Sequence, residues 1–230
     1  MIRLVLFDID GTLVQTSAAG MKAFAKTFAT GFNLDSGTEK MNFAGRTDMI
    51  LVREFFRIHD IDESPVLLRQ FFERYVFWLE HYVRQIREGE CPGVRQFITS
   101  LLALPQPPML GLLTGNIRLG AEIKLRHFGL WDFFMTGAFA DEHENRNQIA
   151  VAALHAARSM LDANLQPQEI VVIGDTPSDV QCGKYIGAKT LAVATGGAKL
   201  EELKPHGADW TVADLTQIGA QELIFRANLS

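Results

Sequence analysis

The stretch Leu4-Val5-Leu6-Phe7-Asp8-Ile9-Asp10-Gly11-Thr12-Leu13 decides how the rest of the chain is interpreted. It begins with an apolar run, which is typical of a strand that is buried on both faces of a parallel sheet. Two carboxylates, Asp8 and Asp10, follow directly, and a Gly-Thr pair then turns the chain. Acidic side chains at the end of a buried strand are costly unless a cation or hydrogen-bond donors compensate them. The stretch therefore predicts a metal site, although aspartates are also common in plain turns.

The composition is that of a globular protein without a nucleic-acid-binding character. The 230 residues are 47% hydrophobic and 21% charged, and the formal net charge is −5. This length allows one large domain, or one domain that carries a smaller insertion. The negative charge argues against a broad basic surface for nucleic acid or anionic lipid. With two cysteines, no signal-peptide pattern and no apolar run long enough to span a bilayer, we expect a cytoplasmic protein.

Two further apolar runs, at residues 109–113 and 170–173, end in polar residues as the first run does. Shorter apolar segments predict two more strands at residues 191–193 and 210–212. Helical patterns separate these strands. The alternation predicts an α/β fold with a doubly wound parallel sheet, that is, a Rossmann-like core.

A long block between the first two strands has helical periods and no convincing strand. Ser17 is placed to cap its first helix, and Ser64-Pro65 is a strong start for a later one. We interpret residues 16–88 as an inserted, all-helical cap domain. The catalytic core is then built from residues 1–15 and 89–230.

The carboxyl ends of parallel strands meet at one edge of a sheet, so polar residues far apart in sequence are expected to converge there. Clustered carboxylates repel one another unless a cation lies among them, and oxygen ligands of this kind suit Mg²⁺. The start of the helix after residue 116 favours an anion. The sequence therefore predicts a metal and a phosphate beside a free carboxylate. The residues expected there are Asp8, Asp10, Thr114, Asn116, Asp175 and Asp179.

Three motifs in this order resemble those of the haloacid dehalogenase-like hydrolase superfamily. Asp8-x-Asp10-Gly11-Thr12 is similar to its first motif, Leu113-Thr114-Gly115-Asn116 to its second, and Gly174-Asp175-Thr176-Pro177-Ser178-Asp179 to its fourth. Each follows a predicted strand, which makes the set specific. The chain most resembles the phosphoglycolate-phosphatase-like branch with a helical cap. The resemblance implies a phosphoric monoester hydrolase that acts on a small phosphorylated metabolite.

The resemblance also implies roles for the aspartates. Asp8 is the expected nucleophile, which forms an aspartyl-phosphate, and Asp10 is the expected general acid and base. Mg²⁺ would be held by Asp8, by the backbone carbonyl of Asp10 and by Asp175, with Asp179 as a ligand or as support for one.

The phosphate-binding groups implied by the resemblance are Thr114, Gly115 and Asn116, together with one cation. The family usually carries a lysine shortly before its fourth motif. The corresponding place here contains Arg146, which binds phosphate differently from a lysine. Lys124 and Lys184 are weaker candidates for the same role.

Simpler interpretations exist for some of these residues. Thr114-Gly115-Asn116 is also a plausible helix cap and turn, and Asp179 is a favourable charge at a helix start. Arg46 is placed to reach an anionic substrate from the cap, but a solvated loop arginine is the simpler interpretation.

Rival functions are a β-phosphoglucomutase-like phosphomutase and a catalytically idle binding module. Dehalogenases and phosphonatases of the superfamily usually lack an acid at the position of Asp10, which disfavours them. The expected partner is a small phosphorylated molecule, with no nucleic acid and no membrane. We expect a monomer or a weak homodimer.

Overall fold

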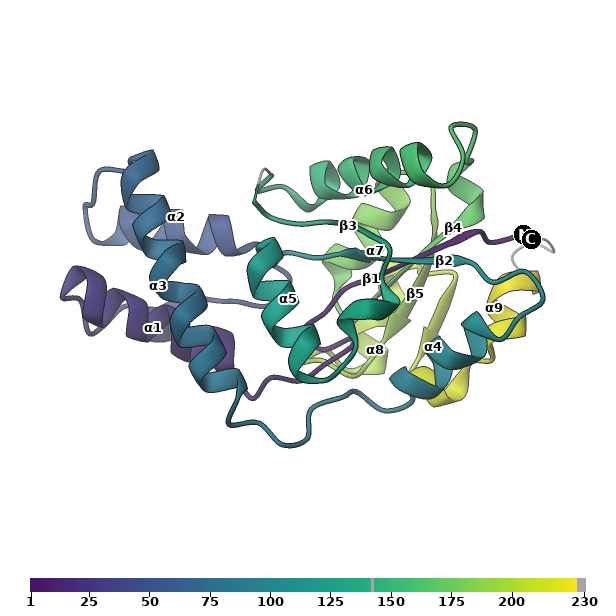
Figure 1. The fold of residues 1–230 in the computed structure, drawn as a ribbon, viewed down its shortest axis with the longest axis horizontal. Coiled ribbons are helices and arrows are strands. Elements are labelled where there is room, and N and C mark those ends of the chain that lie inside the picture. The colour runs from purple at the N-terminus through teal and green to yellow at the C-terminus, as the bar shows by residue number, and fades with distance from the viewer. Residues whose placement is uncertain (142, 227–230) are drawn as a thin grey trace.

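A computed structural model describes residues 1–141 and 143–226 and contains one six-stranded sheet. All the pairings are parallel, in the order β3-β2-β1-β4-β5-β6 (Figure 1). The doubly wound parallel sheet predicted from the sequence is therefore confirmed. The strands are β1 (Leu4–Phe7), β2 (Met109–Leu113), β3 (Thr136–Ala138), β4 (Ile170–Gly174), β5 (Lys189–Val193) and β6 (Trp210–Val212).

Helices cover both faces of the sheet, which explains the uninterrupted apolar run of β1. Val5 and Phe7 pack on the face covered by α4 (Val94–Leu102) and α9 (Ala220–Arg226). Leu4 and Leu6 pack on the opposite face, under α6 (Arg146–Met160) and α7 (Pro177–Tyr185). Side chains of a strand alternate between its faces, so all four are fully buried. Figure 1 shows α6 on one side of the sheet and α4 and α9 on the other.

Residues 16–88 lie at one end of the sheet (Figure 1) and contribute no strand to it, in the part of the chain that the structure describes. They form α1 (Ala19–Phe32), the 3₁₀ turn η1 (Thr38–Lys40), α2 (Asp48–Ile58) and α3 (Pro65–Val83). These helices enclose a separate apolar core that is rich in aromatic rings, among them Phe24, Phe28, Phe55, Phe71 and Tyr75. The division into cap and core remains our interpretation.

Helix α5 (Arg118–His127) connects the two parts. It follows β2 in the sequence and packs against α3. Ile117, just before it, is buried in the core of the helical block. Gly120 faces α3, and a Cβ there would make an ordinary van der Waals contact of 3.5 Å with Leu79 Cδ2. The helical block therefore rests on an element that belongs, by sequence, to the α/β core.

The remaining elements are short. They are η2 (Trp131–Phe133), η3 (Pro167–Glu169), α8 (Leu200–Leu203), η4 (Lys204–His206) and η5 (Leu215–Gln217). No helix within residues 1–141 and 143–226 is long and apolar enough to cross a bilayer.

The structure differs from the sequence-based expectation at two places. Ser17 does not cap the first helix: α1 starts after Ala18, and both residues have left-handed backbones, with φ of 46° and 60°. Ser64 does cap α3, because its Oγ accepts the Leu67 N–H at 3.2 Å. The edge strand β3 was not predicted, since its three residues, Thr-Gly-Ala, carry too little apolar pattern.

Candidate active site

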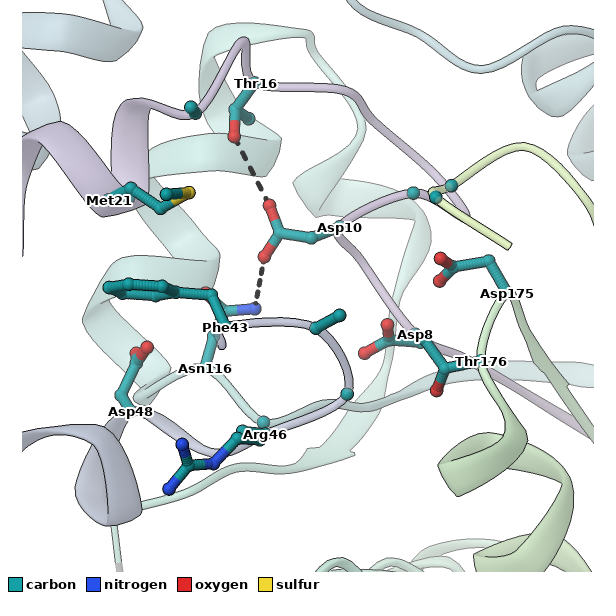
Figure 2. Close-up of a pocket in the computed structure, with 18 of the residues that line it drawn as sticks. Asp8, Asp10, Thr16, Met21, Phe43, Arg46, Asp48, Asn116, Asp175 and Thr176 are labelled. Carbon is teal, nitrogen blue, oxygen red and sulfur yellow. Dashed lines mark hydrogen bonds between the residues drawn. The ribbon is translucent and has the colours of Figure 1, made fainter. Parts of the chain in front are cut away.

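Three carboxylates converge at the carboxyl end of the sheet. Asp8 follows β1, Asp175 follows the neighbouring β4, and Asp179 lies in the first turn of α7. One oxygen from each lies within 4.8 Å of the others. All three side chains are buried. Figure 2 shows Asp8 and Asp175 together on one side of the pocket.

The positive charge of the neighbouring side chains does not balance the negative charge of these three carboxylates. Burial raises the pKa of Asp8, and the charges of Asp179 and Asp10 add to it, although the Arg146 guanidinium opposes them. Burial, together with the charges of Asp179 and Asp8, also raises the pKa of Asp175. A cation among these oxygens would remove the repulsion. Hard oxygen donors of this kind fit Mg²⁺.

Close contacts with neighbouring loops fix the orientation of Asp175. Thr12 donates a hydrogen bond to Asp175 Oδ1 at 3.1 Å. Two glycines pack against the other carboxylate oxygen: a Cβ at Gly11 would lie 2.5 Å from Oδ2, and one at Gly196 only 1.7 Å. Gly11 also has a φ of +83°, in the region that favours glycine. Gly11 and Thr12 of the first motif thus fix the position of the Asp175 carboxylate of the fourth motif.

Arg146, the first residue of α6, lies at this cluster as predicted from the sequence. Its guanidinium forms ion pairs with Asp8, at 3.3 Å, and with Asp179. Burial alone would lower the pKa of Arg146, but the two carboxylates outweigh burial and raise it. Its Nε atom is buried and has no hydrogen-bond partner among the described residues.

Asp179 is already saturated by contacts within the protein. Besides Arg146, its carboxylate accepts hydrogen bonds from the Thr176 N–H at 3.0 Å and from the Thr176 hydroxyl at 2.6 Å. These bonds fix the start of α7. Asp179 therefore holds Arg146 and the fourth-motif loop in place, and its oxygens are less available to a metal ion than those of Asp8 and Asp175.

The Asp10 carboxylate turns away from the three-carboxylate cluster. It accepts hydrogen bonds from the Thr16 hydroxyl at 3.3 Å, the Asn116 amide at 2.8 Å and the Lys124 ammonium at 2.5 Å. Figure 2 shows the first two bonds. The Asp10 side chain is 42% exposed, and it lines the pocket. It is thus accessible to a substrate.

Lys124, on α5, is the most buried cation of the site, with only 3% of its side chain exposed. Its Nζ also donates to Asn116 Oδ1 at 2.6 Å. Burial alone would raise the pKa of Asp10, but the positive charge of Lys124 lowers it below its usual value. Lys184, by contrast, donates to the His206 carbonyl at 2.8 Å and does not line the pocket.

The second-motif residues differ in their position. Gly115 and Asn116 line the pocket, whereas Thr114 is fully buried and its hydroxyl accepts the Asn116 amide at 2.9 Å. Gly115 also touches the helical block, since a Cβ there would lie 2.5 Å from the Arg46 carbonyl oxygen. A larger residue at this position would separate the two parts.

The start of α2 is hydrogen-bonded to this second-motif loop. The Asp48 N–H donates to the Gly115 carbonyl at 2.8 Å, and Asp48 Oδ2 accepts the Ile117 N–H at 2.9 Å. Asp48 is buried, and burial raises its pKa to about 7. The side chains of Arg46 and Asp48 both line the pocket, but Arg46 pairs with Glu54.

The pocket between the sheet edge and the helical block has a volume of about 770 Å³. It holds most of the residues predicted from the sequence: Asp8, Asp10, Gly115, Asn116, Arg146, Asp175 and Arg46. Sequence reasoning missed Asp48 and the contact of Thr16, and it considered Lys124 only as a substitute for Arg146. A lone lysine on the apolar face of α5, between Ala121 and Leu125, was the available indication of a special role.

Comparisons with known proteins agree with this geometry. The family model of haloacid dehalogenase-like hydrolases matches residues 5–193. A pyrophosphatase PpaX from Bacillus cereus is 30% identical, over 94% of this chain and 96% of that protein. The 2-deoxyglucose-6-phosphate phosphatase 1 of Saccharomyces cerevisiae is 29% identical, over 94% and 89%.

Among solved structures, β-phosphoglucomutase from Clostridium difficile superposes with a TM-score of 0.77 at 19% identity, over 100% of this chain and 98% of that one. At this identity the likeness concerns the fold alone. The family match, however, covers most of the chain, and it includes the first, second and fourth motifs that meet at the sheet edge. The chain therefore belongs to the haloacid dehalogenase-like hydrolase family.

Proposed function

We propose that the chain is a Mg²⁺-dependent phosphatase, which hydrolyses a small phosphorylated metabolite through an aspartyl-phosphate on Asp8. The observation that carries the proposal is that Asp8 forms an ion pair with Arg146 at 3.3 Å and lies within 4.8 Å of the carboxylates of Asp175 and Asp179. A carboxylate can attack a phosphate dianion only where positive charge offsets the repulsion. The family match and the phosphatase names of the relatives support the same reaction class.

Asp8, Asp175 and the backbone carbonyl of Asp10 would hold the Mg²⁺. When bound, the ion supplies charge that neutralises the transferring phosphoryl group and the clustered carboxylates. The buried Nε of Arg146 has no partner among the described residues, and a phosphoryl oxygen would give it one. Arg146 would thereby orient the phosphoryl group for attack by Asp8. Thr114, Gly115 and Asn116 remain our candidates for its other oxygens.

The reaction then needs two steps. In the first, Asp8 attacks phosphorus, the bond to the leaving oxygen breaks, and protonated Asp10 gives its proton to that oxygen. In the second, ionised Asp10 takes a proton from water as the water attacks phosphorus, and phosphate leaves Asp8. The exposed Asp10 carboxylate, held by Thr16, Asn116 and Lys124, is positioned for both transfers.

Residues 16–88 would act as a cap domain, which covers the pocket and excludes bulk water during the reaction. Docking of the cap relies on the hydrogen bonds of Asp48 with Gly115 and Ile117. The partner is a small molecule, and we propose that the protein acts in the cytoplasm as a monomer or a weak homodimer.

The first experiment measures phosphate release from an aryl phosphate with Mg²⁺, with a chelator, and with Asp8→Asn. We expect release that needs Mg²⁺ and is lost in Asp8→Asn. Asp132→Asn is the matched control, because Asp132 is 89% exposed and lies outside the pocket. Release without metal, or release that survives Asp8→Asn, would contradict the proposal.

Product analysis separates the phosphatase from its rivals. A phosphomutase returns the phosphoryl group to a sugar, so it would produce an isomeric sugar phosphate with little free phosphate. An idle binding module would produce neither. Mass spectrometry of rapidly quenched enzyme should find one added phosphoryl group on Asp8.

A further inference from the structure

The half of the pocket that faces the helical block is distinct from the half that contains Asp8. It contains the apolar side chains of Met21, Phe24, Phe43 and Leu51, which all line the pocket. Figure 2 shows Met21, Phe43 and Asp48 on one side of Asp10, and Asp8, Asp175 and Thr176 on the other. Because Asp8 must face the phosphoryl group, the apolar half is the place for the leaving group.

Every cation of the pocket already has an acidic partner. Among the described residues that line it, only Arg46, Lys124 and Arg146 are basic. Arg146 pairs with Asp8 and Asp179, and Lys124 lies 2.5 Å from Asp10. Neither cation is free to bind a second anion without leaving a carboxylate unpaired.

Arg46 lies in the sequence between Phe43 and Leu51, two of the apolar residues that line this half of the pocket. Its charge is neutralised by a partner within the helical block. Its guanidinium pairs with Glu54 on α2 and donates to the Asn42 carbonyl at 3.2 Å. In Figure 2 the guanidinium points away from Asp8 and Asp10. It is therefore held away from the position of a bound substrate.

Asp48 adds an acidic group to this half of the pocket. Its carboxylate is buried and is hydrogen-bonded to the Ile117 N–H, and no ion pair joins it to a cation in the described structure. A second phosphate or a carboxylate on the leaving group would have to approach this acid without a free cation beside it. The ionised Asp48 carboxylate would repel such an anion, and the protonated one would offer it no positive charge.

We propose that the leaving group carries no negative charge of its own, so that the preferred substrate is a monophosphate ester of an uncharged alcohol with an apolar face. This inference rests on the proposed phosphatase function. It predicts that bisphosphates, pyrophosphate and phosphorylated carboxylic acids are poor substrates. A hydroxyl group on the alcohol would find acceptors at Asp48 and Asp10, while its carbon skeleton would contact Phe43 and Met21.

The test compares kcat/KM for phosphate release, with Mg²⁺, within two matched pairs of compounds. One pair is 2-hydroxyethyl phosphate and phosphoglycolate; the other is glucose 6-phosphate and glucose 1,6-bisphosphate. We expect the member with the uncharged leaving group to be favoured by at least about tenfold in each pair. Inorganic pyrophosphate should be poorer than an aryl phosphate.

Two variants should weaken the preference by changing the charge in the half of the pocket that faces the helical block, which we call the leaving-group half. Glu54→Gln releases Arg46, and Asp48→Asn removes the acid, so each should raise kcat/KM for the doubly anionic compounds more than for their uncharged partners. Glu63→Gln is the matched control, because Glu63 pairs with Arg53 in the same helical block but does not line the pocket. It should leave both ratios unchanged. Thermal unfolding of each variant identifies loss of the fold.

The outcomes separate this inference from the proposed function. Equal or better turnover of the doubly anionic compounds by the unmodified enzyme overturns the inference and leaves the phosphatase standing. Failure of both Glu54→Gln and Asp48→Asn, when folded, to change the ratios also overturns it. No Mg²⁺-dependent release from any compound, the aryl phosphate included, overturns the proposed function and the inference with it.

Discussion

Replacing Lys124 by methionine tests whether this buried lysine positions Asp10, the proposed general acid. The change keeps an unbranched side chain that is one atom shorter, and it removes hydrogen bonds of 2.5 Å to Asp10 and 2.6 Å to Asn116. Breaking a buried ion pair typically costs about 3–5 kcal/mol. Asp10 is 42% exposed and regains water, which reduces the expected loss of unfolding free energy to about 1–3 kcal/mol.

The effect on catalysis should depend on the leaving group. A misplaced Asp10 cannot protonate an alkoxide well, and acid–base assistance is worth about 10²–10⁴ in rate. We therefore expect kcat for an alkyl phosphate to fall by about 100- to 1,000-fold in Lys124→Met. An aryl phosphate, whose phenolate leaves with little protonation, should lose much less, about tenfold. Steady-state kinetics with both substrates at saturating Mg²⁺ measures the difference.

Lys184→Met provides the matched control. Lys184 is exposed, lies outside the pocket and bonds only to the His206 carbonyl among the contacts described above. Its replacement should change neither rate. Equal losses for the alkyl and the aryl phosphate in folded Lys124→Met would refute the argument, because they would show that the lysine does not act through proton donation by Asp10.

Three further predictions concern the charges of the site. Asp48→Asn should change the pH dependence of stability: the unfolded carboxyl titrates near 3.8 and the folded one near 7, so the folded state binds more protons between these values. The free energy of unfolding of the unmodified protein should then fall, relative to the variant, by up to about 4 kcal/mol as pH rises through this window, as chemical denaturation would show. Arg146→Ala should lower kcat/KM by at least about 100-fold and Arg146→Lys by less, whereas unchanged kinetics would remove Arg146 from the phosphate site. We expect Mg²⁺ to raise the Tm of the unmodified protein and Asp175→Asn to abolish this rise, whereas an undiminished rise in the variant would place the metal elsewhere.

The sheet and its edge were predictable from the sequence because both depend on local patterns. An apolar run followed by Asp8 and Asp10 indicates where a buried strand ends. Parallel pairing then brings Asp175 beside Asp8 without knowledge of any side-chain contact. The proximity of Arg146 to Asp8 followed from the family resemblance, and the structure shows the ion pair.

The leaving-group half of the pocket was not predictable, because it depends on packing between distant segments. Lys124 points into the site because of the orientation in which α5 packs against α3. The amphipathic pattern of either helix does not predict this orientation. Asp48 reaches the Ile117 N–H across 69 residues of sequence. The ion pair with Glu54 determines whether Arg46 can contact a substrate. The sequence of the turn that contains Arg46 does not predict this ion pair.

The packing of α5 has a consequence for anyone who exchanges modules between members of the family. The same face of this helix supplies Lys124 to the pocket and, one turn earlier at Gly120, packs against Leu79 and Tyr75 of α3. A chimera that transplants only residues 16–88 would place foreign side chains on Gly120 and Ile117 and would shift the lysine with them. A graft intended to transfer specificity should therefore carry residues 117–127 as part of the donor segment, because the boundary that preserves catalysis does not coincide with the boundary drawn from chain order.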